Sequence, residues 1–277
     1  MKQKNRDIQL LELDILQYII KICKECNLTY YIIGGSLIGV LRHKGFIPWD
    51  DDIDIGMPRS DYEKFIEICK KDINGQYAII DNSTDPKWFF NFAQIVNKKI
   101  KIKIETTENP RISNPWVDLF PIDGLPSDKK KRKRHFRKIL HYRYLIQLAN
   151  IENQVDQSRK DRPLRERLIL KIFSTFKIKK FINSKNILRK MEIALKTYDF
   201  YQSEYAGNLL GRYREKEVVP KNYFGKPKKL PFEEIMVNVP EKYHELQTHL
   251  YGDYMSLPPK EKQVTHSITI ISNETNL

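Results

Sequence analysis

The chain contains few cysteines, and none of them completes a metal site. Only three occur among 277 residues, Cys23, Cys26 and Cys69, each inside a pattern typical of a helix. Cys23 and Cys26 have the spacing of a metal-binding or redox pair, but a structural zinc site needs a second pair, which the sequence lacks. We therefore interpret all three as ordinary thiols in a reducing compartment.

Long apolar runs are absent as well. No uninterrupted apolar stretch approaches the roughly 20 residues that a membrane-spanning helix needs. The N-terminus is rich in Lys and Gln and is not followed by the apolar run of a secretory signal. We therefore expect a cytoplasmic protein, with membrane contact limited to peripheral binding at the inner face of the cell membrane.

Acidic residues are scarce in one segment. Residues 129–190 contain 21 Lys and Arg against four acids, a local balance of +17. The whole chain carries +14, so the remainder carries 14 − 17 = −3. One basic insert in a nearly neutral chain argues against a nucleic-acid partner, although a basic nucleic-acid-binding protein is the non-enzymatic alternative.

The order of periodic segments predicts an α/β (α+β) fold with a mixed sheet. We expect helices over 7–27, 37–42, 60–71, 186–198 and 241–251, the third opened by a capping box at Ser60. We expect strands over 29–33, 52–56, 77–80, 89–96, 100–104, 116–120 and 231–237. The strand over 100–104 alternates Ile with Lys, as a half-exposed edge strand would.

Three regions follow from this order. We divide the chain into a catalytic core over 1–128, a basic helical insert over 129–200 and a C-terminal segment over 201–277 that packs back on the core. Within the insert, apolar residues recur every four positions at Phe136, Leu140, Tyr144 and Leu148. A second basic amphipathic segment covers 164–182, after a polar loop over 150–160. Such segments bind anionic membrane surfaces, but they also form solvent-facing lids, and the sequence leaves both open.

The stretch over 34–58 joins a glycine turn to clustered carboxylates. Gly34 and Gly35 follow an apolar run, and we expect Ser36 to cap the short helix after them. Free backbone N–H groups at such a helix start favour a bound phosphate. The turn is therefore half of a phosphate-handling site.

The carboxylates supply the other half. Asp50, Asp51, Asp52 and Asp54 lie within five residues, where like charges repel one another unless a cation is present. Strand alternation places Asp52 and Asp54 on one face, opposite Ile53 and Ile55. Asp51 is out of phase, and we rank Asp50 lower because Pro48-Trp49 indicates a turn.

A third carboxylate lies in a later strand. Asp118 alternates with Val117 and Leu119, and an unpaired charge there would be costly. We predict that Asp118 joins Asp52 and Asp54, although a buried Asp bonded to Arg or to backbone is the alternative. The glycines at 207 and 211 flank an apolar pair, which indicates a tight element packed near the site.

Cations and aromatic residues occur close to these blocks. Arg42 and Lys44 lie in a basic loop that can neutralise donor phosphates or simply face water. Aromatic residues also lie within or near these blocks, at Trp49, Trp88, Phe89, Phe90 and Trp116, where they can pack in the core.

Three sequence blocks together resemble the LicD family of phosphotransferases. They are Gly34-Gly35-Ser36 with 42–54 (RHKGFIPWDDDID), 116–121 (WVDLFP) and 251–259 (YGDYMSLPP). The resemblance runs in order from about residue 25 to 266. At Glu234 the chain departs from the family pattern, which has glycine after Phe232-Glu233.

The resemblance implies a nucleotidyltransferase-type core that binds Mg2+, with Mn2+ as a substitute, and a nucleotide. It implies transfer of phosphocholine, or a comparable phospho-alcohol, from a CDP-linked donor to a sugar. This acceptor sugar belongs to a teichoic acid, a lipopolysaccharide or a capsule precursor and is lipid-linked. The family motif falls on Gly35, Ser36, Asp52, Asp54 and Asp118. If the donor is CDP-choline, the aromatic residues near the site could face its quaternary ammonium group. On this resemblance we assign candidate contacts with choline or another substrate to Trp49, Trp116, Glu233, Asp253 and His266. A nucleotidyltransferase acting on a small molecule or sugar is the enzymatic alternative.

Together these observations predict one mechanism. Asp52 and Asp54 hold the metal against the donor pyrophosphate, and Gly35, Ser36 and Arg42 or Lys44 steady the phosphate. Asp118 takes the proton of the acceptor hydroxyl or completes the metal shell, and the sequence does not separate these two roles.

Overall fold

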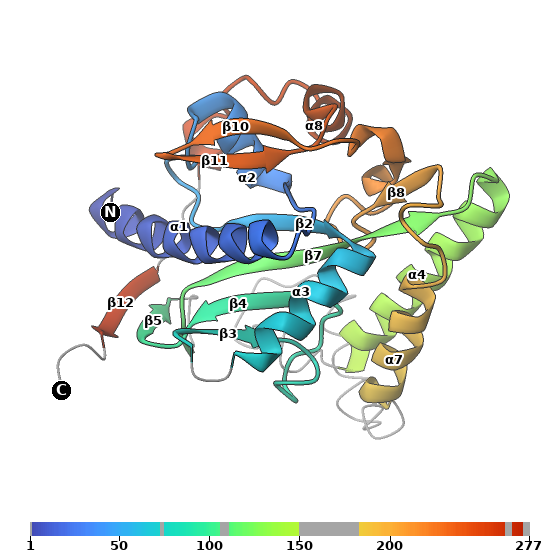
Figure 1. Ribbon diagram of the computed structural model, residues 1–277, viewed down its shortest axis with the longest axis horizontal. Coiled ribbons are helices and arrows are strands. Elements are labelled where there is room, and N and C mark those ends of the chain that lie inside the picture. Colours follow the sequence, from blue (N-terminus) through green and yellow to red (C-terminus); the bar gives the residue numbers. More distant parts are fainter. Residues whose placement is uncertain (1, 73–74, 106–110, 150–182, 264–267, 274–277) are drawn as a thin grey trace, which may run out of the picture.

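A mixed β-sheet forms the centre of the protein (Figure 1). The computed structural model describes residues 2–72, 75–105, 111–149, 183–263 and 268–273. The main strands lie in the order β1 (Tyr31–Ile32), β2 (Asp54–Pro58), β7 (Trp116–Leu125), β4 (Ala93–Asn97) and β3 (Tyr77–Ile80), and β8 (Tyr205–Gly207) and β9 (Val219–Pro220) extend it from β7. Because β2 and β7 pair parallel and their neighbours antiparallel, the predicted mixed α+β fold is confirmed.

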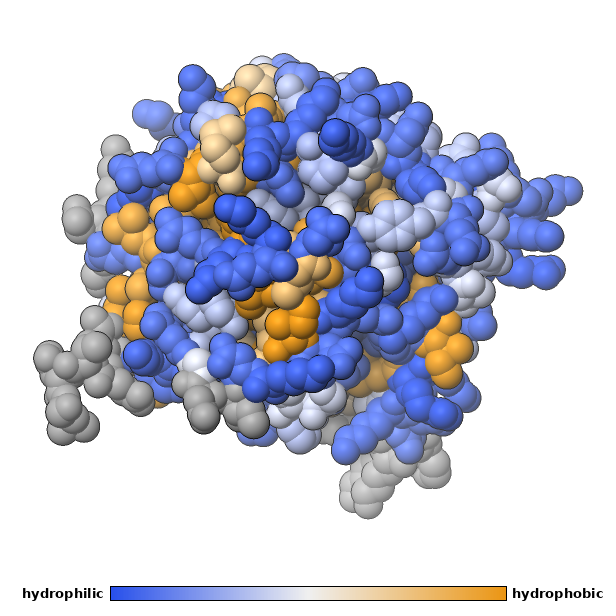
Figure 2. All heavy atoms as spheres, viewed as in Figure 1, coloured by the Kyte–Doolittle hydropathy of each residue, from blue (hydrophilic) through white to orange (hydrophobic). Residues whose placement is uncertain are grey.

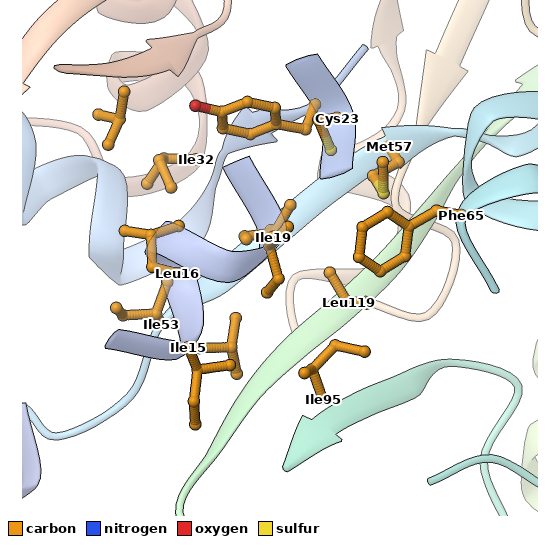
Figure 3. Packing of buried hydrophobic residues seen from close by; sticks show 14 of the residues in the cluster. Ile15, Leu16, Ile19, Cys23, Ile32, Ile53, Met57, Phe65, Ile95 and Leu119 are labelled. Carbon is orange, nitrogen blue, oxygen red and sulfur yellow. The ribbon is translucent and has the colours of Figure 1, made fainter. Parts of the chain in front are cut away.

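Two helices cover one face of this sheet. They are α1 (Lys2–Glu25) and α3 (Arg59–Lys71), and their apolar sides pack on β2, β4 and β7 (Figures 1 and 3). Ile53 and Ile55 are 1% and 0% exposed on this face, which confirms the predicted strand phase. Each such fully buried side chain stabilises the fold by about 1.5–3 kcal/mol. Helix α1 therefore anchors the strand from which Asp54 projects the other way.

The predicted start of α3 is wrong. The helix begins at Arg59 after Pro58, and no side chain caps it. The carboxylate of Asp61 instead accepts hydrogen bonds from Thr29 N at 3.1 Å and Tyr201 Oη at 2.8 Å. Glu63, the other expected member of the capping box, pairs instead with Lys196 at 2.5 Å.

The strand expected at a sheet edge is a central strand. β5 (Ile100–Ile104) lies between β12 (Ile268–Asn273) and β6 (Arg111–Ser113) in a separate three-stranded sheet. Ile102 is 0% exposed. The edge prediction is wrong because β12 comes from the far end of the chain, which local alternation cannot reveal.

The strand expected over 231–237 is a hairpin instead. β10 (Lys228–Phe232) and β11 (Ile235–Val239) pair antiparallel, and Glu233 turns the chain with a φ of 52°. The hairpin lies beside α2 (Gly34–Ile38) and the π-helical turn η1 (Gly39–His43), and both follow β1 (Figure 1). It therefore supports the loop that leads to the clustered aspartates.

The basic insert contributes two described helices. α4 (Lys129–Ala149) packs along α7 (Ser184–Leu195), and residues 150–182, which include both the polar loop and the second amphipathic segment, lie outside the described residues. Tyr144 is 57% exposed, so the four-residue spacing misjudged the buried face. Positions four apart advance 400° around a helix and drift off one side, whereas Phe136, Ile139 and Ile146 stay on it.

The C-terminal segment returns to the main sheet. Its elements are η3 (Arg214–Glu217), η4 (Lys221–Tyr223), α8 (Tyr243–Tyr251) and η5 (Lys260–Lys262). α8 ends at Gly252, as predicted, where φ is 74°. Within the described part of the chain, no helix is long and apolar enough to cross a bilayer.

Candidate active site

The glycine turn brings backbone against a carboxylate. Gly34 has a φ of 63°, a left-handed conformation that favours glycine. A Cβ at this position would lie 2.7 Å from Asp54 Oδ2. The Gly34 carbonyl accepts a hydrogen bond from Gln247 Nε2 on α8 at 2.9 Å. The backbone conformation and the close packing explain why the turn requires glycine, and the hydrogen bond holds the turn against α8.

Ser36 has a different place from the one expected. Helix α2 begins at Gly34 with Ile33 as its N-cap, so Ser36 is its third residue and caps nothing. Its Oγ accepts a hydrogen bond from Asp54 N at 2.8 Å and donates to Asp52 O at 3.4 Å. The capping prediction is therefore wrong, and the hydroxyl ties α2 to the start of β2.

A cavity of about 420 Å³ opens beside the turn. Its first wall carries Gly34, Gly35, Asp50, Asp52 and Asp54. Thus the structure brings the glycine turn together with Asp52 and Asp54, the two aspartates that strand alternation favoured, and it adds Asp50. Residues from the C-terminal third of the chain complete the cavity.

Helix α1 holds Asp50 in this wall. Asn5 Nδ2 and Gln9 Nε2 donate to the Asp50 carbonyl at 3.2 and 2.8 Å. A Cβ on Gly35 would lie 3.3 Å from Asp50 Oδ2. Asp51 is 1% exposed and does not line the cavity, in agreement with its opposite phase.

Asp118 lies beside Asp54 but does not line the cavity. The two residues are register partners on the parallel strands β2 and β7. Gln94 Nε2 donates to Asp118 Oδ1 at 2.8 Å, and Trp116 Nε1 donates to Oδ2 at 3.4 Å. Burial, together with the charge of Asp52, raises the pKa of Asp118 to about 7, although these two hydrogen bonds oppose the rise.

Burial raises the pKa of Asp54 well above its ordinary value. The charges of Asp52, Asp118 and Asp50 raise it further. A cation in the cavity would favour the ionised carboxylates and relieve this repulsion.

The donor set suits Mg2+ in kind. The described residues contain no group of three His, Cys, Asp or Glu side chains that could hold a metal, so Asp52, Asp54 and Asp118 do not form a ready three-ligand centre. Mg2+, however, commonly takes one or two carboxylates and fills its shell with water and substrate phosphates. Asp52 and Asp54, which line the cavity, meet that requirement.

The remaining lining of the cavity was only partly foreseen. It includes Asn208, Arg212, Tyr213, Glu217 and Tyr251. The first three lie in the glycine-flanked segment over 207–213, which had indicated a tight element near the site. Glu217 was missed because it lies in a run of charged residues, Arg214 to Glu217, that looks like an ordinary exposed turn.

The predicted phosphate-binding cations do not line the cavity. Arg42 Nη1 donates to the carbonyls of Tyr254 and Ser256 at 2.9 and 3.1 Å, and its guanidinium lies 5.9 Å from the Trp49 ring centroid. Lys44 is exposed, with a φ of 56°. Arg42 thus holds the loop over 254–256 against the basic loop.

Glu233 forms a clamp at the hairpin turn. Arg6 Nη1 and Nη2 donate to its two carboxylate oxygens at 3.1 and 2.7 Å, and Phe46 N donates to Oε1 at 3.2 Å. Its own N donates to Lys44 O at 2.7 Å. Glu233 therefore joins α1, the hairpin and the basic loop, outside the cavity.

The other substrate candidates also lie outside the cavity lining. Trp49 packs with Tyr254, and Trp116 packs beside β5 and β12. Asp253 is exposed and accepts a hydrogen bond from Ser256 Oγ at 2.5 Å. His266 lies outside the described residues. The structure does not bring these residues together.

A carboxylate-lined cavity beside a glycine turn is an arrangement suited to phosphate-transferring enzymes. Comparison with known proteins agrees. A sequence model described as "LicD/FKTN/FKRP, nucleotidyltransferase domain" matches residues 27–152. The lipopolysaccharide cholinephosphotransferase LicD of Haemophilus influenzae is 32% identical over 267 residues, 95% of this chain and 96% of that protein.

A shorter match concerns a human protein. The ribitol 5-phosphate transferase FKRP of Homo sapiens is 39% identical over 41 residues, which are 15% of this chain and 8% of FKRP. The near full-length match to the Haemophilus protein decides the family. This chain belongs to the LicD family and is a phosphotransferase.

Proposed function

We propose that this enzyme transfers a phospho-alcohol group, phosphocholine from CDP-choline, to a sugar of a cell-surface glycan or its lipid-linked precursor. The observation that carries this proposal is the cavity in which Asp52 and Asp54 face the Gly34-Gly35 turn. The near full-length similarity to a lipopolysaccharide cholinephosphotransferase supports the choice of phospho-alcohol and acceptor.

The chain's own groups would bind and orient the donor. In the proposed reaction the acceptor hydroxyl forms a bond to the phosphorus of the phospho-alcohol, the phosphoanhydride bond to CMP breaks, and CMP leaves. The N–H groups at the start of α2, at Gly34 and Gly35, would bind the donor phosphates. Ser36 would act indirectly, because its hydroxyl fixes the backbone of Asp52 and Asp54.

Mg2+ fits this site as the proposed cofactor, with Mn2+ as a substitute. Asp52 and Asp54 would hold it, and it would supply positive charge against the donor pyrophosphate. Asp50 adds a third carboxylate to the same wall. This role explains why the chain keeps several like charges together despite their repulsion.

Asp118 retains two proposed roles. Its carboxylate could accept the proton of the acceptor hydroxyl, and its place beside Asp54 also allows it to support the metal shell. The pH profile of kcat/KM separates the two roles. Loss of an ionisation from the profile in Asp118→Asn, with the Mg2+ dependence unchanged, supports the base, whereas a raised Mg2+ requirement supports the metal role.

The proposal is tested by incubating the purified protein with Mg2+, a glycan acceptor and, separately, CDP-choline, CDP-ethanolamine, CDP-glycerol and CDP-ribitol. We expect CMP release, greatest with CDP-choline. Release of pyrophosphate from a nucleoside triphosphate, with no CMP from any CDP-alcohol, would overturn the proposal in favour of nucleotidyl transfer.

We also propose that the basic insert brings the enzyme to a lipid-linked acceptor at the inner face of the cell membrane. The N-terminal half of α4 exposes several Lys and Arg side chains, Lys129, Lys130, Lys131, Lys133, Arg134, Arg137 and Lys138. α4 extends at the edge of the molecule, where hydrophilic side chains gather in the same view (Figures 1 and 2). Each basic residue near an anionic membrane surface contributes about 1 kcal/mol.

A further inference from the structure

The lining of the cavity includes residues whose chemistry differs from that of the aspartates. Tyr213 and Tyr251 are two of them, with ring centroids 4.9 Å apart and ring planes at 72°. Glu217, Leu246 and Leu250 line the same cavity. Two aromatic rings and one carboxylate are the groups that recognise a bulky organic cation.

Glu217 is held in place by closely packed backbone. Tyr213 N donates to its Oε1 at 3.2 Å. A Cβ on Gly211 would overlap the Glu217 carboxylate, and one on Gly207 would overlap the Glu217 carbonyl. These two contacts give a reason for the glycines that flank the apolar pair at 209–210. The segment is shaped to present Glu217 to the cavity.

The carboxylate of Glu217 forms no ion pair with a Lys or Arg in the described part of the chain. The charge of Arg143 favours the ionised form of Glu217. The Nη1 of Arg143 itself donates to the carbonyls of Leu209 and Gly211, each at 3.2 Å. Burial nevertheless raises the pKa of Glu217 to about 7. A cation bound in the cavity would stabilise the ionised carboxylate.

We infer that Tyr213, Tyr251 and Glu217 form the subsite for a quaternary ammonium group on the alcohol of the donor. The inference rests on the proposed function and names the residues that would recognise the cationic alcohol proposed there. The phosphate end would lie against the Asp52 and Asp54 wall, and the trimethylammonium group against the tyrosines. An uncharged alcohol such as glycerol or ribitol would leave the carboxylate without a cation.

The test is calorimetric binding of CDP-choline and CDP-glycerol to the full-length protein with Mg2+. Wild-type protein is expected to bind CDP-choline about tenfold more tightly, as a partly desolvated cation–aromatic contact with a carboxylate would give. Glu217→Gln and Tyr213→Leu should each raise the Kd for CDP-choline about tenfold and leave the Kd for CDP-glycerol within about twofold. Tyr213→Phe keeps the ring and should retain the preference.

Glu215→Gln is the matched control, because Glu215 lies in the same short helix and is exposed. It should change neither Kd, and circular dichroism of every variant checks the fold. Equal losses for both donors, or no loss, would overturn the inference. CMP release only from a neutral CDP-alcohol would also overturn it and would exclude choline as the alcohol, while phospho-alcohol transfer itself stands. Absence of CMP from every donor would instead reject the proposed function, whatever the binding data.

Discussion

Gly34 and Asp54 are packed so closely that no side chain fits between them: a Cβ on Gly34 would lie 2.7 Å from Asp54 Oδ2. The φ of Gly34, 63°, also disfavours any other residue. We expect Gly34→Ala to lower stability by about 1–2 kcal/mol and to abolish most activity by displacing the carboxylate.

Gly252→Ala provides the control for this substitution. Gly252 has a similar φ of 74°, but a Cβ there would meet nothing within 4 Å. Its stability cost should therefore come from the backbone conformation alone, and its activity should stay close to that of the wild type. Urea unfolding and CMP release measure the two effects separately. Equal activity in the two variants would contradict the role of the Gly34–Asp54 contact.

The carboxylates of Asp52 and Asp54 are expected to matter for activity and not for folding. Asp52→Asn and Asp54→Asn should each lower kcat/KM by about 10³ or more, because each removes a charged carboxylate that we propose holds the metal. Since burial and like charges raise the pKa of Asp54, removing its charge should leave the melting temperature unchanged or higher. Glu67→Gln, at an exposed carboxylate, is the control. A variant at position 54 that unfolds while the control does not would identify Asp54 as structural.

Local patterns predicted the part of the site that lies within one stretch of chain. The burial of Ile53 and Ile55 followed from strand alternation, because residues two apart share a face. The pairing of Asp54 with Asp118 was inferred because a lone carboxylate in an apolar strand requires a partner. These inferences needed no long-range geometry.

The rest of the site depends on contacts that no local pattern contains. Glu233 and its partner Arg6 are 227 positions apart. The hairpin at Glu233 has no glycine at its turn, so the usual signal was missing and one strand was expected. Glu217 lines the same cavity as Asp54, at the end of η3, which packs against α8. Side-chain type alone could not distinguish it from the charged residues around it.

The Arg6–Glu233 clamp should stabilise the loop before the aspartates. We expect Glu233→Gln to cost about 1 kcal/mol, less than a buried pair, since Arg6 is 42% exposed. Arg6 lowers the pKa of Glu233, so this stabilisation is present above the unfolded pKa and is lost as pH falls through the folded value. Unfolding in urea at pH 7 and pH 3.5 measures it.

Gly45 tests the same clamp independently, because a Cβ on Gly45 would overlap the Glu233 carboxylate. Gly45→Ala should destabilise the wild type, and the cost should shrink in a Glu233→Ala background. The double-mutant cycle should give a coupling of about 1 kcal/mol. Additive costs would show that Glu233 does not pack against Gly45 in solution.

The exposed cations of α4 should bind anionic membranes through charge. We expect the protein to co-sediment with phosphatidylserine-containing vesicles at low salt and to dissociate as the salt concentration rises, because screening shortens the range of these interactions. Replacing Lys129, Lys130 and Lys131 with Gln should weaken binding, whereas replacing exposed Lys24 and Lys98 should not. Absence of sedimentation at low salt would favour the lid interpretation of the insert.

Glu12 on α1 is expected to reduce stability at neutral pH. It is 0% exposed, and within the described part of the chain neither carboxylate oxygen has a hydrogen-bond partner. Burial, with the charges of Asp52 and Asp51, raises its pKa well above the ordinary value. As pH rises above about 4, the unfolded chain releases this proton first, so stability falls by up to about 1.4 kcal/mol per pH unit until the folded pKa is reached. Glu12→Gln should therefore be more stable than the wild type at pH 7 in EDTA and similar in stability at pH 4. Glu25→Gln, at an exposed residue at the end of α1, is the control and should leave the stability at both pH values unchanged. Parallel curves of stability against pH for Glu12→Gln and the wild type would contradict the assignment.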